Sequence, residues 1–144
     1  MLGKVTSMLA ADAGAAFDRA GNAVKVAREI APVLAERASK YDESDAFVAE
    51  NYRLLKESGL VEAGVPQELG GGGADVAELA EMLRTLAYAC SSTALAFSMH
   101  THQVAIPAWR WRHQKVMAAE PLLKRIAAER LILLRHDTDP FNRW

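Results

Sequence analysis

Apolar residues recur every three or four positions along most of the chain, a period that predicts helices. The first such run covers residues 17–41, with charged residues on its opposite face. Pro32 lies inside it and removes one backbone donor, so we expect either one long bent helix or two collinear helices. The apolar stripe consists of Phe17, Ala20, Val24, Ala27, Ala31, Leu34, Ala38 and Tyr41.

A second helix is predicted to begin after Ser44, a residue type that often serves as an N-cap. Val48, Tyr52 and Leu55 form its expected buried stripe. Gly59 follows at a place suited to the left-handed conformation that ends many helices.

The third helix has the clearest start signal in the chain. Asp75 can cap it, and Glu78 stands three positions later, as in a capping box. Its expected buried face comprises Val76, Leu79, Ala80, Leu83, Leu86, Ala87 and Cys90.

Residues 91–106 contain no charged side chain, and their first two turns are almost all apolar or small. Ser91 and Ser92 can cap a helix here, and Pro107 is expected to end it. A helix that is apolar on every side usually lies among other helices, so we predict that this one is central.

A fifth helix is predicted from about Ala118, because Pro121 is compatible with a first turn. Its apolar face comprises Leu122, Leu123, Ile126 and Ala127. Residues 130–134, RLILL, fit either a continuation of this helix or a buried strand, and periodicity does not separate the two. Residues 135–144 are polar and aperiodic, and we expect a loose tail.

The composition is that of a globular chain of 144 residues, half of them hydrophobic, with a net charge of −1. This balance implies no general attraction to nucleic acid or to an anionic membrane. No run of about twenty apolar residues is present, so we expect no membrane span, and we recognise no signal peptide. Cys90 is the only cysteine, which excludes an internal disulfide and fits a cytoplasmic location.

Four consecutive glycines, residues 70–73, precede the third helix and raise the question of a phosphate site. A P-loop would need a Lys-Ser or Lys-Thr pair after the last glycine, and a dinucleotide fingerprint would need a preceding strand. Neither is present, and Asp75 at the helix start would repel phosphate. A joint between two helices is the better interpretation.

His100 and His102 form an HTH triplet inside the fourth predicted helix. Residues two apart on a helix point about 200° apart, so these two cannot share a metal ion, and we expect no metal site. We expect one of them to line a cavity or to make a hydrogen bond in the core. His102 shares a stripe with Leu95, Ser98 and Met99, which fits either a small-molecule pocket wall or an ordinary helix core.

Residues 109–115, WRWRHQK, interleave aromatic and basic side chains, as some nucleic-acid-binding segments do. The patch is isolated in a chain of balanced charge, so we expect no nucleic-acid partner. The predicted structure is a solvated loop with partly buried tryptophans.

Three segments together carry a resemblance to a known family. They are EIAPVLAERASKYD in the first helix, LLKESGLVEAGVPQELGGGGAD across the glycine joint, and ELAEMLRTLAYACSSTALAFSMHTHQVA after it. In this order they resemble the N-terminal helical domain of acyl-CoA dehydrogenases over about residues 17–134. The resemblance implies an all-α fold, a five- to six-helix orthogonal or up-down bundle.

The resemblance also implies domain limits. Residues 1–16 would be an N-terminal extension, residues 17–130 the helical domain, residues 131–134 the start of a middle domain, and residues 135–144 a divergent polar tail. Because the tail matches nothing in the family, we hypothesise a truncated or frameshifted reading frame. Reading the DNA downstream of Trp144 in all three frames tests this.

The function implied is FAD-dependent α,β-dehydrogenation of acyl-CoA thioesters, in fatty acid metabolism. The implied partners are an acyl-CoA substrate and an electron-transfer flavoprotein. In the family, the catalytic glutamate and the FAD-binding motifs belong to later segments. We therefore assign no catalytic residue here, and we do not expect this chain alone to bind FAD or to be active.

The start of the fourth helix helps to close the far end of the acyl-chain pocket in the family. The resemblance therefore implies that Ala94, Leu95, Ser98, Met99 and His102 line a substrate pocket, and it favours this role over that of ordinary core. Flavin-dependent monooxygenases of the same fold share much of this pattern and stay open as an alternative. So does a non-catalytic helical remnant or assembly module, whose exposed apolar helix would lead to self-association.

Overall fold

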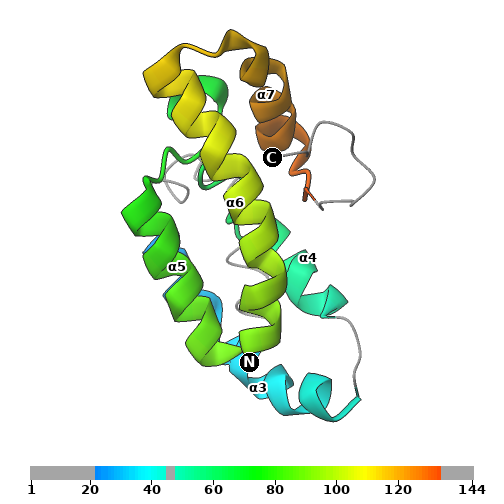
Figure 1. Ribbon diagram of the computed structural model, residues 1–144. Helices are drawn as coiled ribbons and strands as arrows, with labels where there is room; N and C mark the ends of the chain where they lie inside the picture. Colours follow the sequence, from blue (N-terminus) through cyan, green and yellow to red (C-terminus); the bar gives the residue numbers. More distant parts are fainter. Residues whose placement is uncertain (1–21, 45–47, 134–144) are drawn as a thin grey trace, which may run out of the picture.

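The computed structural model describes residues 22–44 and 48–133, and these form five α-helices and two short 3-10 helices with no strand (Figure 1). The predicted all-α fold is confirmed. The elements in chain order are α3 (Ala23–Ser44), α4 (Ala49–Glu57), η1 (Gln67–Leu69), α5 (Val76–Ala89), α6 (Ser91–Gln114), η2 (Met117–Ala119) and α7 (Glu120–Glu129).

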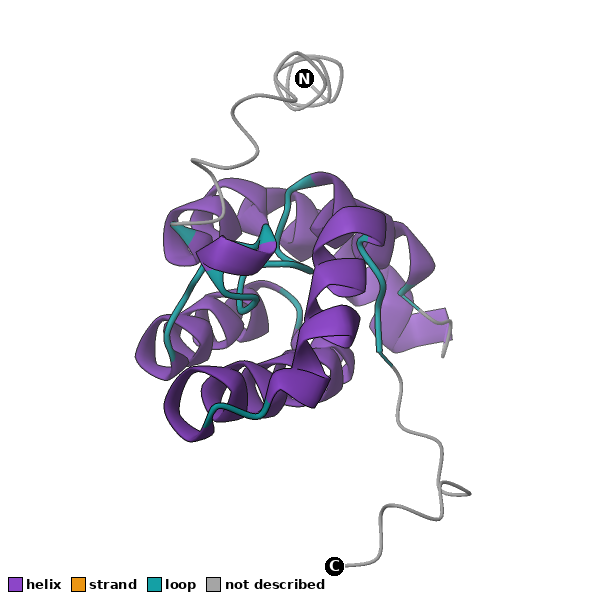
Figure 2. Ribbon diagram, turned by 90° about the horizontal axis from the view of Figure 1, so that it is seen from above, coloured by secondary structure: helices purple, strands orange, loops and turns teal. Residues whose placement is uncertain are grey.

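The longest helix, α6, is central, as predicted, because it contacts each of the other four α-helices. Helices α5 and α6 meet at Cys90 and run side by side in opposite directions, while α3 packs along α5 (Figure 1). Loops and short 3-10 helices connect α4 to α5 and α6 to α7, and the helices pack against one another between them (Figure 2). Helix α7 returns to contact both α6 and η1, which closes one end of the bundle.

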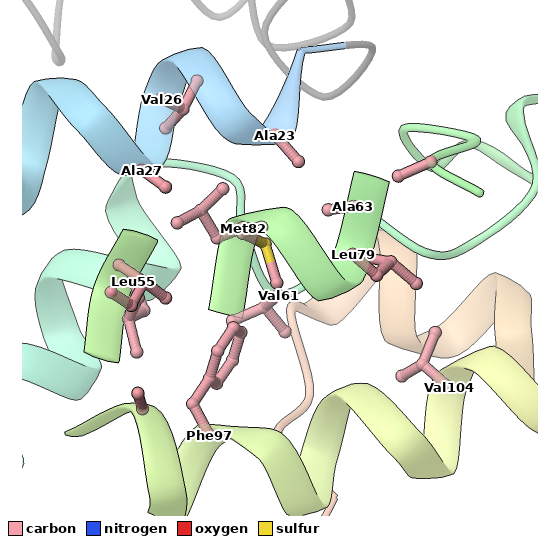
Figure 3. Packing of buried hydrophobic residues seen from close by; sticks show 14 of the residues in the cluster. Ala23, Val26, Ala27, Leu55, Val61, Ala63, Leu79, Met82, Phe97 and Val104 are labelled. Atoms are coloured by element: carbon pink, nitrogen blue, oxygen red, sulfur yellow. The ribbon is translucent and has the colours of Figure 1, made fainter. Parts of the chain in front are cut away.

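Met82 of α5 lies in the middle of the core, although the sequence pattern did not place it on the buried face. Figure 3 shows it among Ala27 of α3, Val61 of the turn that follows α4, and Phe97 of α6. Its flexible thioether suits a position where three segments meet at irregular spacing. Sequence periodicity predicts a single buried face for a helix, whereas α5 is covered by α3 on one side and by α6 on another.

The buried face of α5 is therefore rotated from the predicted one. Leu79, Leu86 and Cys90 are buried as predicted and Leu83 is half-buried, whereas Val76, Ala80 and Ala87 are exposed.

Helix α3 continues through Pro32 as one helix rather than two. Pro32 is exposed, so its missing N–H leaves no buried group without a partner. The buried face also differs from the prediction, because the larger side chains of Val26 and Ile30 point inward. Of the predicted stripe, Ala27, Leu34 and Tyr41 are buried, Val24, Ala31 and Ala38 are half-buried, and Phe17 and Ala20 lie outside the described residues.

The predicted helix start at Ser44 is wrong. Ser44 is the last residue of α3, and its hydroxyl donates to the Lys40 carbonyl oxygen at 2.6 Å. A serine hydroxyl can bond backward to a carbonyl as well as forward to an N–H group, so sequence alone does not fix its role. Helix α4 begins at Ala49, after Val48, without a side-chain cap.

The end of α4 follows the prediction. Gly59 has φ +81° and its N–H donates to the Lys56 carbonyl oxygen at 3.2 Å. The N–H of Leu60 donates to the Leu55 carbonyl oxygen at 3.1 Å. These two bonds form a Schellman motif, which uses the free carbonyls at the helix end. The predicted stripe of Val48, Tyr52 and Leu55 is buried.

Asp75 caps α5 as predicted, since its carboxylate accepts from the Glu78 N–H at 2.8 Å. The reciprocal half of the capping box is absent. The Glu78 carboxylate instead accepts from the backbone N–H of Ala23, at the first residue of α3, at 3.2 Å. One glutamate therefore joins the N-terminal ends of two helices that are 55 residues apart in the sequence.

The glycine run forms the predicted joint between α4 and α5. Gly70 and Gly73 have φ values of +90° and +70°. Gly71 packs so closely on Val65 that a Cβ there would lie 2.3 Å from the Val65 Cβ. The N–H groups of the four glycines donate within the joint itself, to the carbonyl oxygens of Gln67, Pro66, Glu62 and Val65 in order.

Pro107 does not end the fourth helix, contrary to the prediction. Helix α6 runs on to Gln114 and ends at Lys115, which has φ +56°. Val104 and Ala108 on either side of the proline are buried, and this packing stabilises the helix where one hydrogen bond is lost.

The aromatic and basic segment is consequently helical rather than a loop. Trp111 is half-buried and its indole N–H donates to a Glu120 carboxylate oxygen at 3.3 Å, whereas Trp109 is exposed.

The last described segment is neither a helical extension nor a strand. Helix α7 has Pro121 in its first turn, as predicted, and ends at Arg130, which has φ +50°. Residues 131–133 are half-buried and irregular. Within the predicted apolar face of α7, Leu123 and Ile126 are fully buried, Ala127 is half-buried and Leu122 is exposed.

Candidate functional site

The residues expected to line a pocket lie on two sides of α6. Ala94 faces the core and is 6% exposed. Leu95 and Met99 are 73% and 43% exposed, His102 is also exposed, and Ser98 is half-buried. We call Leu95, Ser98, Met99 and His102 the open face. The structure brings these four together because they are three or four residues apart on one helix, and it separates them from Ala94.

The open face is apolar and uncharged. No Asp, Glu, Lys or Arg occurs between Ser91 and Ile106, and Ile106 continues the exposed apolar surface toward Trp109. The Ser98 hydroxyl donates to the Leu95 carbonyl oxygen at 2.6 Å, so its hydrogen is already used. The face therefore offers apolar side chains and one imidazole to whatever covers it.

A shallow hollow lies beside the C-terminal half of α6, away from most of the open face. It has a volume of about 100 Å³, and its lining includes Asp75, Val76, Trp109, Arg112 and His113. Small-molecule sites usually enclose roughly 300–1,000 Å³. This hollow is too small for a nucleotide or an acyl chain.

The family resemblance implies FAD, and neither of two features of the structure fits it. The glycine joint does not fit, because the N–H groups of its four glycines are bonded within the joint and none is left to hold a phosphate. The hollow beside α6 does not fit because of its size.

The buried histidine of the HTH triplet is His100, which is 1% exposed. Its Nε2 lies 2.8 Å from the Val61 carbonyl oxygen, and its Nδ1 lies 3.0 Å from the Leu133 backbone nitrogen. The sequence predicted that one of the two histidines lines a cavity or makes a core hydrogen bond, and His100 makes the hydrogen bond. The signal that distinguishes them is spacing, since position 100 lies on the buried stripe with Phe97 and Val104.

The two partners of His100 determine its tautomer. A carbonyl oxygen only accepts and a backbone N–H only donates, so Nε2 carries the hydrogen and Nδ1 is bare. Burial lowers the pKa of His100, and the bond to Val61 offsets this only in part. The ring also stacks on Phe97 with centroids 5.3 Å apart. His100 is therefore a neutral link between three segments.

A second buried polar cluster joins α4 to α6. The Asn51 side-chain amide donates to the Thr93 hydroxyl at 2.8 Å, and Thr93 donates to the Cys90 sulfur at 3.1 Å. Arg37 of α3 completes the cluster by donating to the side-chain oxygen Oδ1 of Asn51 at 3.2 Å. No local sequence signal predicts this cluster, because its members are far apart in the chain.

An ion pair between a buried carboxylate and a half-exposed arginine is also not predicted by the sequence pattern. Glu62 is 6% exposed, and its Oε1 lies 3.2 Å from Nε of Arg130. Burial raises the pKa of Glu62, and the positive charge of Arg130 opposes this rise. Arg130 also donates to the Lys56 carbonyl oxygen at 3.2 Å, so it joins the end of α7 to the end of α4.

No group of three or more His, Cys, Asp or Glu side chains within residues 22–44 and 48–133 is placed to hold a metal ion. Among the helices that the structure describes, none is long and apolar enough to span a bilayer.

Comparison with known proteins identifies the family. The profile described as "Acyl-CoA dehydrogenase, N-terminal domain" matches residues 23–125, most of the chain. No solved structure matches the chain.

Three curated relatives are similar to parts of the chain. It is 38% identical over 82 residues to the oxygenase component of p-hydroxyphenylacetate 3-hydroxylase from Acinetobacter baumannii, covering 55% of this chain and 19% of that protein. It is 40% identical over 68 residues to cyclohex-1-ene-1-carbonyl-CoA dehydrogenase from Syntrophus aciditrophicus (strain SB), covering 47% and 16%. It is 32% identical over 110 residues to dibenzothiophene monooxygenase from Mycolicibacterium goodii, covering 76% and 26%.

The chain thus spans only about a fifth of the length of the curated relatives that it matches. The profile match and the all-α fold agree with each other and with the three quoted segments. The chain belongs to the acyl-CoA dehydrogenase family, through that family's N-terminal helical domain.

Proposed function

We propose that this chain supplies the N-terminal domain of a flavoprotein that carries out FAD-dependent α,β-dehydrogenation of acyl-CoA thioesters. The family match over residues 23–125 is the observation that carries this proposal. One relative is itself a dehydrogenase of an acyl-CoA, which supports the same substrate class. An electron-transfer flavoprotein would be the electron acceptor, and the buried, unpaired Cys90 suits a cytoplasmic location.

The open face of α6 would form part of the wall that holds the acyl chain. Its exposed Leu95 and Met99 side chains offer apolar contact without any charge nearby. Ala94, on the core-facing side of α6, would support this wall by packing the helix onto the core. His102 would supply the one polar group at the far end of the face.

A flavin-dependent monooxygenase is the second candidate. Two relatives, at 38% and 32% identity, are an oxygenase component and a monooxygenase. In that case the same open face would contact an aromatic substrate instead of an acyl chain.

Methyl NMR on the 144-residue chain distinguishes the two candidates. Leu95 and Met99 carry ¹³C-methyl reporters, and Leu122, exposed on α7, is the matched control. A medium-chain acyl-CoA should shift Leu95 and Met99 but not Leu122, and free CoA should shift none of them. Shifts caused by p-hydroxyphenylacetate or dibenzothiophene alone would favour the monooxygenase. If neither ligand class shifts the two reporters, the pocket-wall assignment is wrong.

We also propose that these residues alone are not catalytically competent. Most of the length of each relative has no counterpart in this chain, and neither feature tested above fits a flavin. Mixing the purified chain with FAD should leave flavin fluorescence unchanged. Flavin that binds and then bleaches anaerobically after addition of an acyl-CoA would overturn this proposal.

A further inference from the structure

Two contacts hold the end of the described chain on one turn. Residues 60–65 form a turn between α4 and η1, and residues 130–133 lie against it. His100 links Leu133 to Val61, and Arg130 pairs with Glu62. The two contacts reach adjacent residues of the turn, although they come from different elements.

We propose that His100 is a proton-operated latch, which holds residues 131–133 on this turn when it is neutral and releases them when it is protonated. The geometry makes the Leu133 contact at Nδ1 sensitive to protonation and leaves the Val61 contact at Nε2 intact. Protonation adds a hydrogen to Nδ1, which then faces the Leu133 N–H group as donor against donor. The Nε2 hydrogen can still bond to the Val61 carbonyl oxygen in either state.

Within residues 22–44 and 48–133, the surroundings of His100 offer no counter-charge to an imidazolium. The ring lies among uncharged residues of α5, α6 and the turn, namely Leu60, Val61, Gly64, Leu79, Thr101 and Val104. Phe97 covers one face of the ring. The charged side chains on the two segments that the latch joins are Glu62 and Arg130, and they pair with each other. A proton on His100 therefore has no anionic partner in the described part of the chain, which favours opening.

The neighbouring ion pair responds to acid in the opposite sense. Glu62 Oε2 is buried and has no hydrogen-bond partner among the described residues, so only one of its oxygens is engaged. Burial raises the pKa of this carboxyl group, so by linkage its protonation favours the folded state, whereas burial lowers the pKa of His100. The release in acid therefore rests on the contact between His100 and Leu133.

Hydrogen exchange of the Leu133 amide in the 144-residue chain tests the latch. Between pH 7.5 and 5, its protection factor, corrected for intrinsic exchange, should fall about tenfold for each pH unit below the His100 midpoint. The Phe97 amide in the core is the internal control and should stay protected. Leu133 protection that does not change while His100 titrates by NMR would overturn the proposal.

Two substitutions separate the roles of the ring nitrogens. His100→Asn places an acceptor near the Nδ1 position without a titratable group, so Leu133 should stay protected at both pH values. His100→Gln keeps a donor for Val61 but loses the acceptor, so Leu133 should exchange freely at both. His102→Gln, an exposed histidine on the same helix, is the matched control and should behave as the unsubstituted chain.

Leu133→Pro keeps the test decisive if the His100 variants fail to fold. This substitution removes the N–H donor and leaves His100 in place. Because the lost bond stabilises the neutral ring, the NMR titration midpoint of His100 should rise. An unchanged midpoint would show that Leu133 does not hold the ring, and the latch would then be rejected.

Discussion

Phe97 connects the aromatic contacts of the core at the scale of single residues. It is fully buried, packs edge-on against Tyr52 with centroids 6.4 Å apart, and stacks on His100 at 5.3 Å. One side chain of α6 therefore contacts both α4 and the latch histidine. Phe97 therefore packs the core-facing side of α6 onto its neighbours, although the opposite side of this helix carries the open face.

Phe97→Ala should lower the free energy of unfolding by about 3–5 kcal/mol, because it removes a fully buried ring and leaves a cavity. Urea denaturation followed by circular dichroism measures this. Leu95→Ala on the exposed side of the same helix is the control and should change stability by no more than about 0.5 kcal/mol. Equal losses in the two variants would mean that the assigned faces of α6 are wrong.

The lowered pKa of His100 predicts a loss of stability in mild acid. In the unfolded chain His100 titrates near its ordinary pKa of 6.5, and in the folded chain it titrates lower. Between these values the unfolded state binds more protons, so the free energy of unfolding should fall as the pH drops below about 6.5.

Urea titrations at pH 7.5, 6.5 and 5.5 measure this slope. Glu62, whose pKa is raised, acts in the opposite direction, because its contribution to stability is lost as the pH rises through its folded pKa. Glu62 is present in both the original chain and His100→Asn, so the difference between their slopes reports His100 alone. The same slope in both chains would contradict the prediction.

Two connections between elements depend on backbone geometry. Glu78 links the start of α5 to the start of α3, and the glycine joint brings η1 back against residues 60–65. In the joint, position 71 has no room for a side chain, because a Cβ there would lie 2.4 Å from the Val65 carbonyl oxygen. Backbone atoms cannot move aside as a flexible side chain can.

Gly71→Ala should therefore destabilise the fold by about 2 kcal/mol, as overpacking typically does. Thermal and urea unfolding both measure this change. Glu68→Ala, at an exposed position of η1 in the same joint, is the matched control and should cost no more than about 0.5 kcal/mol. A Gly71→Ala chain as stable as the control would show that the joint is looser than described.

At the scale of the whole molecule, the open face is a surface that exposes apolar side chains to solvent. With Ile106 and Trp109 it forms an exposed apolar band along α6. Bands of this kind usually contact another surface. We expect the 144-residue chain to self-associate through it.

Sedimentation velocity over a hundredfold range of concentration tests this expectation. The unsubstituted chain should shift toward larger species at high concentration. The double variant Leu95→Lys, Met99→Lys should stay monomeric, because two charges cannot be buried without partners. Gln114→Lys, an exposed position of α6 outside the band, is the control and should associate as the original chain does. A monomer at every concentration of the original chain would contradict this.

Local signals were enough to predict several features. Asp75 as a cap, Gly59 as a helix end and Pro121 in a first turn each depend on a few adjacent residues, and all three are confirmed. The predictions that Pro107 ends a helix and that Ser44 caps one are wrong for the same reason. Each has a local preference that packing or an alternative hydrogen bond overrides. The pocket-lining role of the open face stays a prediction.

The sequence by itself determined the all-α class, the glycine joint and the family, because helical period, caps and segment order are written along the chain. Only the tertiary structure decided where Glu62 and Arg130 meet, and that Met82 lies inside. These facts concern residues that are distant in the chain and adjacent in space. Helical period specifies a face to within about one residue, or 100°, and the neighbouring helices settle the rest.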